Sequence, residues 1–297
     1  MKIWNILFFC LSLHTINNIN FKNMNTMRKL FLVCAMAVFG LGQSFAQLDP
    51  DEMGFFNHVS LGVSAGTDGI GISLAAPMGQ HFGLRAGYNF LPKFSYDTTL
   101  DLGSSSAFTT NEVKLKGELN MGDFHVLVDY YPFTSSSFHL TAGAYFGKDK
   151  FVSVGNTAPF VKESYWGNAG IELGTTETIY STYTMVSDPN TGDVNADLKV
   201  NSFKPYVGIG FGRAVPRKRI GLQFDLGVQF WGTPELWTNI QSFDYNQGEY
   251  VMKNQKVNKN RITNPDSDYK DLKDAIKTIE KIGVYPVMTL RINGRIF

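Results

Sequence analysis

The clearest pattern in the chain is a strict alternation of apolar and polar residues from Ile220 to Trp231. Even-numbered positions from 220 to 230 are all apolar, and odd-numbered positions from 221 to 229 are all Gly, Gln or Asp. A period of two predicts a β-strand, because a helix would place Asp225 on the same surface as Phe224 and Val228. At about ten residues, the segment has the length of a membrane-crossing barrel strand.

The same alternation predicts further strands along the chain. A flip in its phase at Gly122-Asp123 is interpreted as a β-bulge within one long strand. Residues 148–200 are predicted to be long and irregular, with strand-like fragments such as Ile179–Val186, and residues 236–265 to be polar and loop-like. The other predicted strands cover residues 59–64, 70–76, 82–90, 113–130, 138–146, 203–213 and 284–297.

The connections between these strands alternate in length, which favours one fold. Those after the second, fourth and sixth strands are short, and those after the third, fifth and seventh are long; only the turn at Thr67–Gly69 departs from the rule. Short turns at one end and long loops at the other are typical of transmembrane barrels. We therefore predict an all-β, antiparallel up-and-down transmembrane β-barrel of eight strands, with ten as the alternative. A soluble secreted β-sandwich is the competing fold.

Aromatic residues gather near the predicted strand ends, as in the interfacial belts of membrane proteins. The two predicted girdles contain Phe90, Phe94, Phe151, Trp231 and Trp237 at the loop end, and Phe56, Tyr130, Tyr131 and Phe133 at the turn end.

One amphipathic helix is predicted before the last strand, at Asp266–Ile282. Leu272, Ile276 and Ile279 share one face, and Gly283 can end the helix. We expect this helix to belong to the last long loop, where it packs against the barrel rim or folds into its mouth.

The N-terminal region has the features of an export signal. Met27-Arg28-Lys29 is basic, Leu30–Leu41 is a short apolar run, and Ser44-Phe45-Ala46 supplies small residues for cleavage. We therefore expect an upstream extension at 1–26, a signal peptide at 27–46 and a barrel domain at 47–297. Both cysteines, Cys10 and Cys34, precede this cleavage point, so no thiol chemistry is expected in the mature chain.

Composition agrees with a barrel. Charged residues make up 18% of the chain, aromatic residues 14%, the net charge is +1 and the mean hydropathy is −0.11. Alternating strands average out in bulk hydropathy, so this low value is compatible with a membrane barrel.

These features together show a resemblance to a known class of protein. The leader, the alternating strands, the pair 203–213 and 220–231, and a closing strand ending in Phe297 resemble the small outer-membrane β-barrels of Bacteroidota, of the OmpA/OmpX-like or porin-like kind. The resemblance implies location in the cell outer membrane, contact with its lipid or lipopolysaccharide, and assembly by the barrel-assembly machinery. Arg295 departs from the usual terminal signal, which has an apolar or aromatic residue at that position.

Polar residues on the inward faces of the predicted strands form the candidate site. Charges inside a narrow barrel must be paired or hydrated, so a structural salt-bridge network is the leading interpretation and a narrow polar conduit the alternative. The predicted lumen-facing set is Arg85, His125, Asp129, His139, Gln223, Asp225, Arg291 and Arg295.

Other motifs add no chemistry to this interpretation. Asp188–Asp193 is expected to be a turn rather than a calcium site, and Arg217-Lys218-Arg219 a solvated turn rather than a nucleic-acid patch. We predict no enzymatic activity, no catalytic, cofactor or metal site, and a monomer with no nucleic-acid partner. The predicted function is a structural or surface role carried by long extracellular loops. The alternative is a small porin or ligand conduit for small polar or amphipathic solutes.

Overall fold

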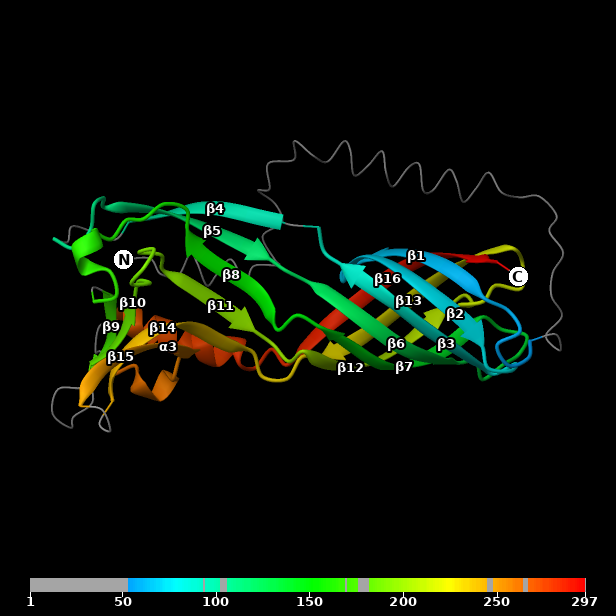
Figure 1. Cartoon of the computed structure of the whole chain (residues 1–297). Helices are drawn as coiled ribbons and strands as arrows, with labels where there is room; N and C mark the ends of the chain where they lie inside the picture. The colour runs from blue at the N-terminus through cyan, green and yellow to red at the C-terminus, as the bar shows by residue number, and fades with distance from the viewer. Residues whose placement is uncertain are drawn as a thin grey trace.

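The chain forms a closed β-barrel whose wall continues into a second β-sheet at one end (Figure 1). The computed structural model describes residues 53–92, 94–101, 106–168, 170–175, 182–244, 248–263 and 267–296. The predicted upstream extension, signal peptide and terminal Phe297 lie outside these residues.

Eight antiparallel strands make the barrel, in the order β1-β16-β13-β12-β7-β6-β3-β2. The first and last strands close it, with Ser60 opposite Arg295 and Gly66 opposite Thr289. This confirms the eight-stranded prediction and excludes both ten strands and a sandwich. The barrel strands are β1 (Ser60–Gly66), β2 (Gly69–Pro77), β3 (Phe82–Phe90), β6 (Gly122–Tyr130), β7 (Phe138–Gly147), β12 (Phe203–Phe211), β13 (Ile220–Phe230) and β16 (Val284–Arg295).

The outer surface of the barrel is apolar, and the inner surface carries most of its polar residues. Val63, Leu74, Leu226 and Leu290 point outward and are exposed, whereas their neighbours in the strands point inward and are buried. A water-soluble protein does not expose so large an apolar area, and only a closed barrel or a helix satisfies its backbone in lipid. The barrel therefore has the architecture of a membrane-spanning protein.

The second sheet, called here the outer sheet, prolongs the barrel wall. The β3–β6 ladder ends at Phe90 opposite Gly122, and Phe94 opposite Leu119 continues it in β4–β5 with almost unchanged register. Its strands are β4 (Phe94–Asp101), β5 (Glu112–Leu119), β8 (Lys150–Asn156), β11 (Asn195–Lys199), β14 (Glu235–Asp244), β10 (Thr182–Val186) and β9 (Gly170–Thr175), with β15 (Glu249–Lys256) paired to β14.

Strand β10 lies within the predicted strand-like fragment Ile179–Val186, whereas β8, β9, β11, β14 and β15 lie largely in regions predicted to be irregular or loop-like, and there the prediction was wrong. Apart from β14, which has ten residues, the segments are short and alternate weakly. They are stabilised by their neighbours, as β11 is by β8 and β14 on its two sides. Such strands depend on a sheet that local sequence does not reveal.

The predicted bulge at Gly122-Asp123 is also wrong. Val113, Leu115, Met121, Asp123 and His125 are all buried on the inner side, so the alternation runs from β5 into β6 without an extra residue. What changes is the chemistry of the two faces. In β5 the inner face is apolar and Lys114 and Lys116 point outward, while in β6 the outer face is apolar. Apolar residues thus face outward on β6 and inward on β5. This inversion is expected where a barrel wall passes from lipid into water, because its outer face then meets water.

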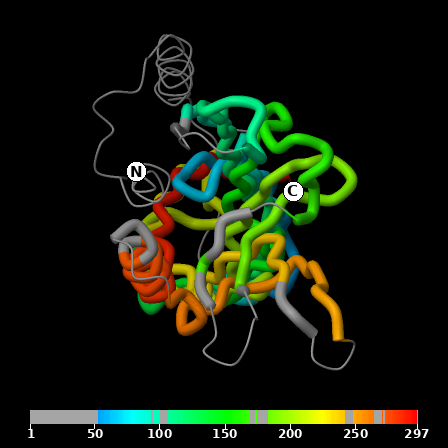
Figure 2. The backbone as a smooth tube through the Cα atoms, turned by 90° about the vertical axis from the view of Figure 1, so that its left-hand side faces the viewer, coloured from blue at the N-terminus to red at the C-terminus, as the bar shows by residue number. Residues whose placement is uncertain are grey.

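The predicted helix is present as α3, at Ser267–Ile279. Ile276 and Ile279 are buried; Ile276 packs with Ile240 of β14 and Ile262, and Leu272 lies against the same group. The helix thus packs on the outer sheet rather than on the barrel rim or in its mouth. Figure 2 shows it at the side of the outer strands.

Two short 3-10 turns, η3 (Glu163–Tyr165) and η4 (Lys259–Arg261), complete the elements described. No helix in the described ranges is long and apolar enough to cross a lipid bilayer.

Candidate functional site: the lumen and its two ends

Asp225 of β13 is the centre of a polar cluster halfway along the lumen. Its carboxylate accepts hydrogen bonds from Arg85 Nη1 at 2.9 Å, Gln223 Nε2 at 3.2 Å and Arg291 Nη1 at 3.3 Å. His139 Nε2 lies 2.8 Å from the same carboxylate. All these side chains are buried. Because each buried charge has an opposite charge as partner, the cluster avoids the large cost of isolated charges in a desolvated core.

The Arg85–Asp225 ion pair crosses the full width of the barrel. Strands β3 and β13 are separated by β6, β7 and β12 on one side and by β2, β1 and β16 on the other. The two residues therefore come from opposite walls. Side chains fill the interior of an eight-stranded barrel, and this pair closes the middle of it.

A second carboxylate completes the charge balance. Asp129 of β6 accepts hydrogen bonds from Arg85 Nη2 at 2.7 Å and from the Thr141 hydroxyl at 2.7 Å. Two arginines, Arg85 and Arg291, thus face two aspartates. On the other side of the cluster, Asn293 donates to Gln223 Oε1 at 3.0 Å, which extends the network toward the turn end.

The structure brings six of the eight predicted residues into this cluster, namely Arg85, Asp129, His139, Gln223, Asp225 and Arg291. His125 is buried on the inner wall, but neither ring nitrogen has a hydrogen-bond partner among the described residues. Its ring lies 5.1 Å from that of Tyr145.

The placement of Arg295 in the lumen was wrong. Its guanidinium donates to the carbonyl of Arg217 at 2.8 Å, beyond the turn end of the barrel. Arg295 is the last residue of β16, so the alternation that places Arg291 and Asn293 inside reaches it only after the lumen has ended.

Sequence reasoning missed a second ion pair nearer the loop end. Lys204 of β12 and Asp123 of β6 are both buried, with Lys204 Nζ 2.7 Å from Asp123 Oδ1. Both residues have the inward parity of their strands, so the alternation itself could have identified them. Gly147 of β7 lies between them, where a Cβ would collide with the Asp123 carboxylate.

Bulky apolar and aromatic side chains fill the lumen between the central cluster and the loop end. Leu127, Tyr145, Tyr206 and Val287 pack together there. Glycines opposite them make room for their rings, since a side chain at Gly227 would overlap the Tyr206 hydroxyl. Nearer the turn end, a Cβ at Gly210 would lie 2.5 Å from His139 Nε2. These lumen glycines are therefore explained by packing.

At the loop end, an aromatic cap closes the lumen. Trp231 stacks on Tyr285 with ring centroids 4.5 Å apart, and Phe151 meets Trp231 edge-on at 4.6 Å. Met121 and Val200 pack in the same group. Trp231 Nε1 donates to Gln229 Oε1 at 2.9 Å, so the buried indole is satisfied.

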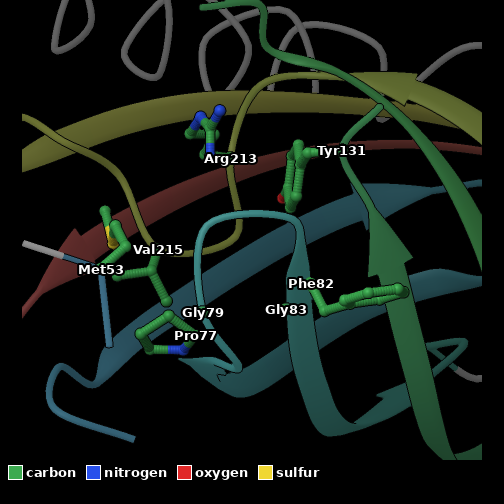
Figure 3. A pocket seen from close by; sticks show the side chains of 8 residues that line it. All are labelled: Met53, Pro77, Gly79, Phe82, Gly83, Tyr131, Arg213 and Val215. Carbon is green, nitrogen blue, oxygen red and sulfur yellow. The ribbon is translucent and has the colours of Figure 1, made fainter. Parts of the chain in front are cut away.

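At the turn end, Tyr131 and the N-terminal segment close the lumen (Figure 3). Arg213 lies over the Tyr131 ring at 4.5 Å, and Met53 packs against Val215 and Ala214. The cavity that remains between these side chains is about 10 Å³, hardly the room of one water molecule.

The predicted aromatic girdles are present, but with some different members. Tyr131, Trp231 and Phe151 belong to the two closures inside the wall rather than to the girdles, and Trp237 is half-buried in the outer sheet. The side chain of Phe94 lies outside the described part. The exposed aromatic residues form a loop-end ring of Phe90, Phe124, Phe146, Phe203 and Phe230, and a turn-end group of Phe56, Phe82, Tyr130, Phe133 and Phe211.

The predicted turn at Asp188–Asp193 has the geometry of a side-chain-capped turn. Asp188 Oδ1 accepts from the backbone N–H of Asn190 at 2.8 Å and of Thr191 at 3.2 Å. Within the described ranges, no three His, Cys, Asp or Glu residues are grouped as a metal site would require.

Comparisons with known proteins find similar solved structures at low sequence identity. No protein-family model and no curated protein sequence matches the chain. CarO2 of Acinetobacter baumannii is 17% identical with a TM-score of 0.43, covering 80% of this chain and 98% of that one. CarO of the same organism is 16% identical with a TM-score of 0.40, covering 81% and 99%. A major outer membrane protein from Thermus thermophilus is 14% identical with a TM-score of 0.32, covering 80% and 98%.

Proposed function

We propose that the protein is an integral outer-membrane protein whose barrel anchors the outer sheet at the cell surface and that works by surface contact rather than by conduction. The observation that carries this proposal is the closed lumen. Three successive groups of side chains fill it, from the Trp231 cap through the Arg85–Asp225 cluster to the Tyr131 closure. A solute would have to displace all three.

The orientation follows from the two ends of the barrel. Outer-membrane barrels keep short turns in the periplasm and long connections outside. Here the first and last barrel strands have their chain ends at the end with the short turns, and the outer sheet lies at the other. The outer sheet is thus proposed to be extracellular. Membership in the Bacteroidota group, assembly by the barrel-assembly machinery and the monomeric state stay predictions, and the proposal includes no enzymatic activity.

Conductance measurements test the proposed closed state. The mature chain is refolded into vesicles, and insertion is verified by its heat-modifiable gel mobility. We expect planar bilayers fused with these vesicles to show no defined openings. Regular unitary openings from inserted, folded protein would contradict the proposal and favour the small porin or ligand conduit.

Cysteine labelling tests the orientation. Both cysteines precede the predicted cleavage point, so a single new thiol reports one position. Lys281→Cys lies beyond α3, whereas Lys218→Cys lies at the turn end, and both side chains are exposed. In intact cells, a membrane-impermeant maleimide should label the first variant only. Labelling of Lys218→Cys alone would reverse the orientation.

A further inference from the structure

The described residues at the turn end of the barrel include a cluster of positive charges. Arg213, Arg217, Lys218 and Arg219 lie in the β12–β13 turn, and Arg295 of β16 lies against them. These five residues are called the basic rim. The described segments that surround it at this end, residues 53–59, 78–81, 131–137 and 212–219, contain no Asp or Glu.

The arginines of the basic rim donate hydrogen bonds to backbone carbonyls, which fix their positions but do not neutralise their charges. Arg213 Nη2 donates to the carbonyls of Thr134 at 2.8 Å and Ser136 at 3.0 Å, and Arg217 donates to the Thr134 carbonyl. Arg295 donates to the Arg217 carbonyl at 2.8 Å. In the described part of the chain, none of the five forms an ion pair, whereas the lumen arginines and Lys204 all do.

The surroundings of Arg213 disfavour its positive charge. Partial burial, followed by the neighbouring Arg217, lowers the pKa of Arg213 from its ordinary value. Lys218 and Arg219 are exposed at the outside of the turn, and among the described residues their side chains have no hydrogen-bond or ion-pair partner. A cluster of positive side chains without carboxylate partners is stabilised when an anion from outside the chain binds to it.

The surface next to the basic rim is apolar. Phe211 is 57% exposed and Ile220 is 39% exposed, and they flank the β12–β13 turn on the outward face of the barrel. Exposed aromatic residues of this kind lie at the level of lipid head groups. Lys218 and Arg219 are next to Ile220 in the chain, so their charges lie at the same level.

We propose that the basic rim binds the phosphate groups of anionic phospholipids in the leaflet at the turn end. This inference rests on the proposed function, because it requires the barrel to span a membrane. The acyl chains would lie along Phe211 and Ile220, and Lys218 and Arg219 would contact the phosphates. It replaces the interpretation of Arg217-Lys218-Arg219 as a merely solvated turn.

Lipid retention tests the proposal. The mature chain is folded into nanodiscs of phosphatidylcholine, alone or mixed with phosphatidylglycerol, and native mass spectrometry counts the lipids retained on release. The test variant is Lys218→Gln with Arg219→Gln, because neither side chain supports the turn. Lys270→Gln with Lys281→Gln removes the same charge from exposed positions at the opposite end.

We expect the wild type and the opposite-end variant to retain phosphatidylglycerol in preference to phosphatidylcholine. An interfacial cation is worth roughly a fivefold preference for anionic lipid, so losing two should lower the preference roughly 25-fold. Equal retention of both lipids by the folded wild type would overturn the basic-rim site, as would equal losses in the two variants. A chain that reaches no heat-modifiable state in any lipid would instead overturn the proposed function.

Discussion

Asp225 illustrates how a residue in a narrow barrel depends on partners from distant strands. Its carboxylate is contacted from β3, β7 and β16, and it offsets two arginines whose charges would otherwise repel each other. Such a cluster stabilises the barrel only when all its members are present, because loss of one member leaves a buried charge without a partner.

Asp225→Asn should therefore destabilise the barrel strongly. It leaves two buried guanidinium groups facing Asp129 alone, and breaking a buried pair costs about 3–5 kcal/mol. The measurement is the urea midpoint of the heat-modifiable band.

The matched control is the double variant Asp225→Asn with Arg291→Gln, which restores the charge balance. We expect it to recover part of the lost stability. A double variant that is less stable than Asp225→Asn would show that charge balance is not what the cluster supplies.

At the scale of elements, β5 and β6 are consecutive strands that share one alternation of buried and exposed residues across Asn120-Met121. The inner face changes from apolar at Val113 to polar at Asp123, while the backbone alternation does not change. On this inner face, an apolar residue is therefore favoured at position 113 and a polar residue at position 123.

Val126→Arg and Lys116→Val test this inversion. Val126 points to the lipid side of β6, where an arginine should cost about 2–4 kcal/mol and reduce the yield of inserted barrel. Lys116 has the same parity in β5 but points to water, so its replacement should change stability by about 0.5 kcal/mol or less. Comparable losses of insertion in vesicles would place the lipid boundary elsewhere.

Helix α3 has a role that its amphipathic pattern indicated only in part. The pattern showed that the helix needs a partner, and the structure supplies one in Ile240 of the outer sheet and Ile262, which follows η4. A single helix of this length is marginal in water, so docking stabilises it.

Ile276→Ala should loosen the outer sheet and leave the barrel intact. Ile276 is 3% exposed, and truncating such a residue costs about 2–5 kcal/mol. Limited proteolysis should become faster within residues 182–263, while the heat-modifiable mobility is kept. The exposed Lys270→Ala serves as the control. Loss of the folded barrel in Ile276→Ala would show that the two parts unfold together.

At the scale of the whole molecule, the barrel and the outer sheet share one wall but have different cores. The barrel core is polar at its centre and capped by aromatic residues, and the outer sheet is apolar inside. The barrel has no free edge, whereas the outer sheet has edges at β4, β9 and β15.

Protease added outside vesicles should therefore cut the outer sheet first. We expect the cleaved barrel to stay assembled in SDS until it is heated, because every barrel strand is hydrogen-bonded on both sides. Fragments that separate without heating would show that the outer sheet holds the barrel closed.

The sequence by itself determined the barrel. The two-residue alternation is a local property, and together with loop lengths it predicted the strands, their number and the inward facing of Arg85, Asp129 and Asp225. It also predicted the helix at nearly its observed bounds.

Only the tertiary structure decided which solvent each face meets and which inward residues meet one another. The inversion at Gly122 resembled a bulge because the alternation records a change of polarity and not its cause. Arg295 kept the inward parity but lies past the end of the lumen, and Arg85 meets Asp225 only because closure brings opposite walls together. The short strands of the outer sheet, likewise, exist through neighbours far away in the chain, and no local pattern contains that information.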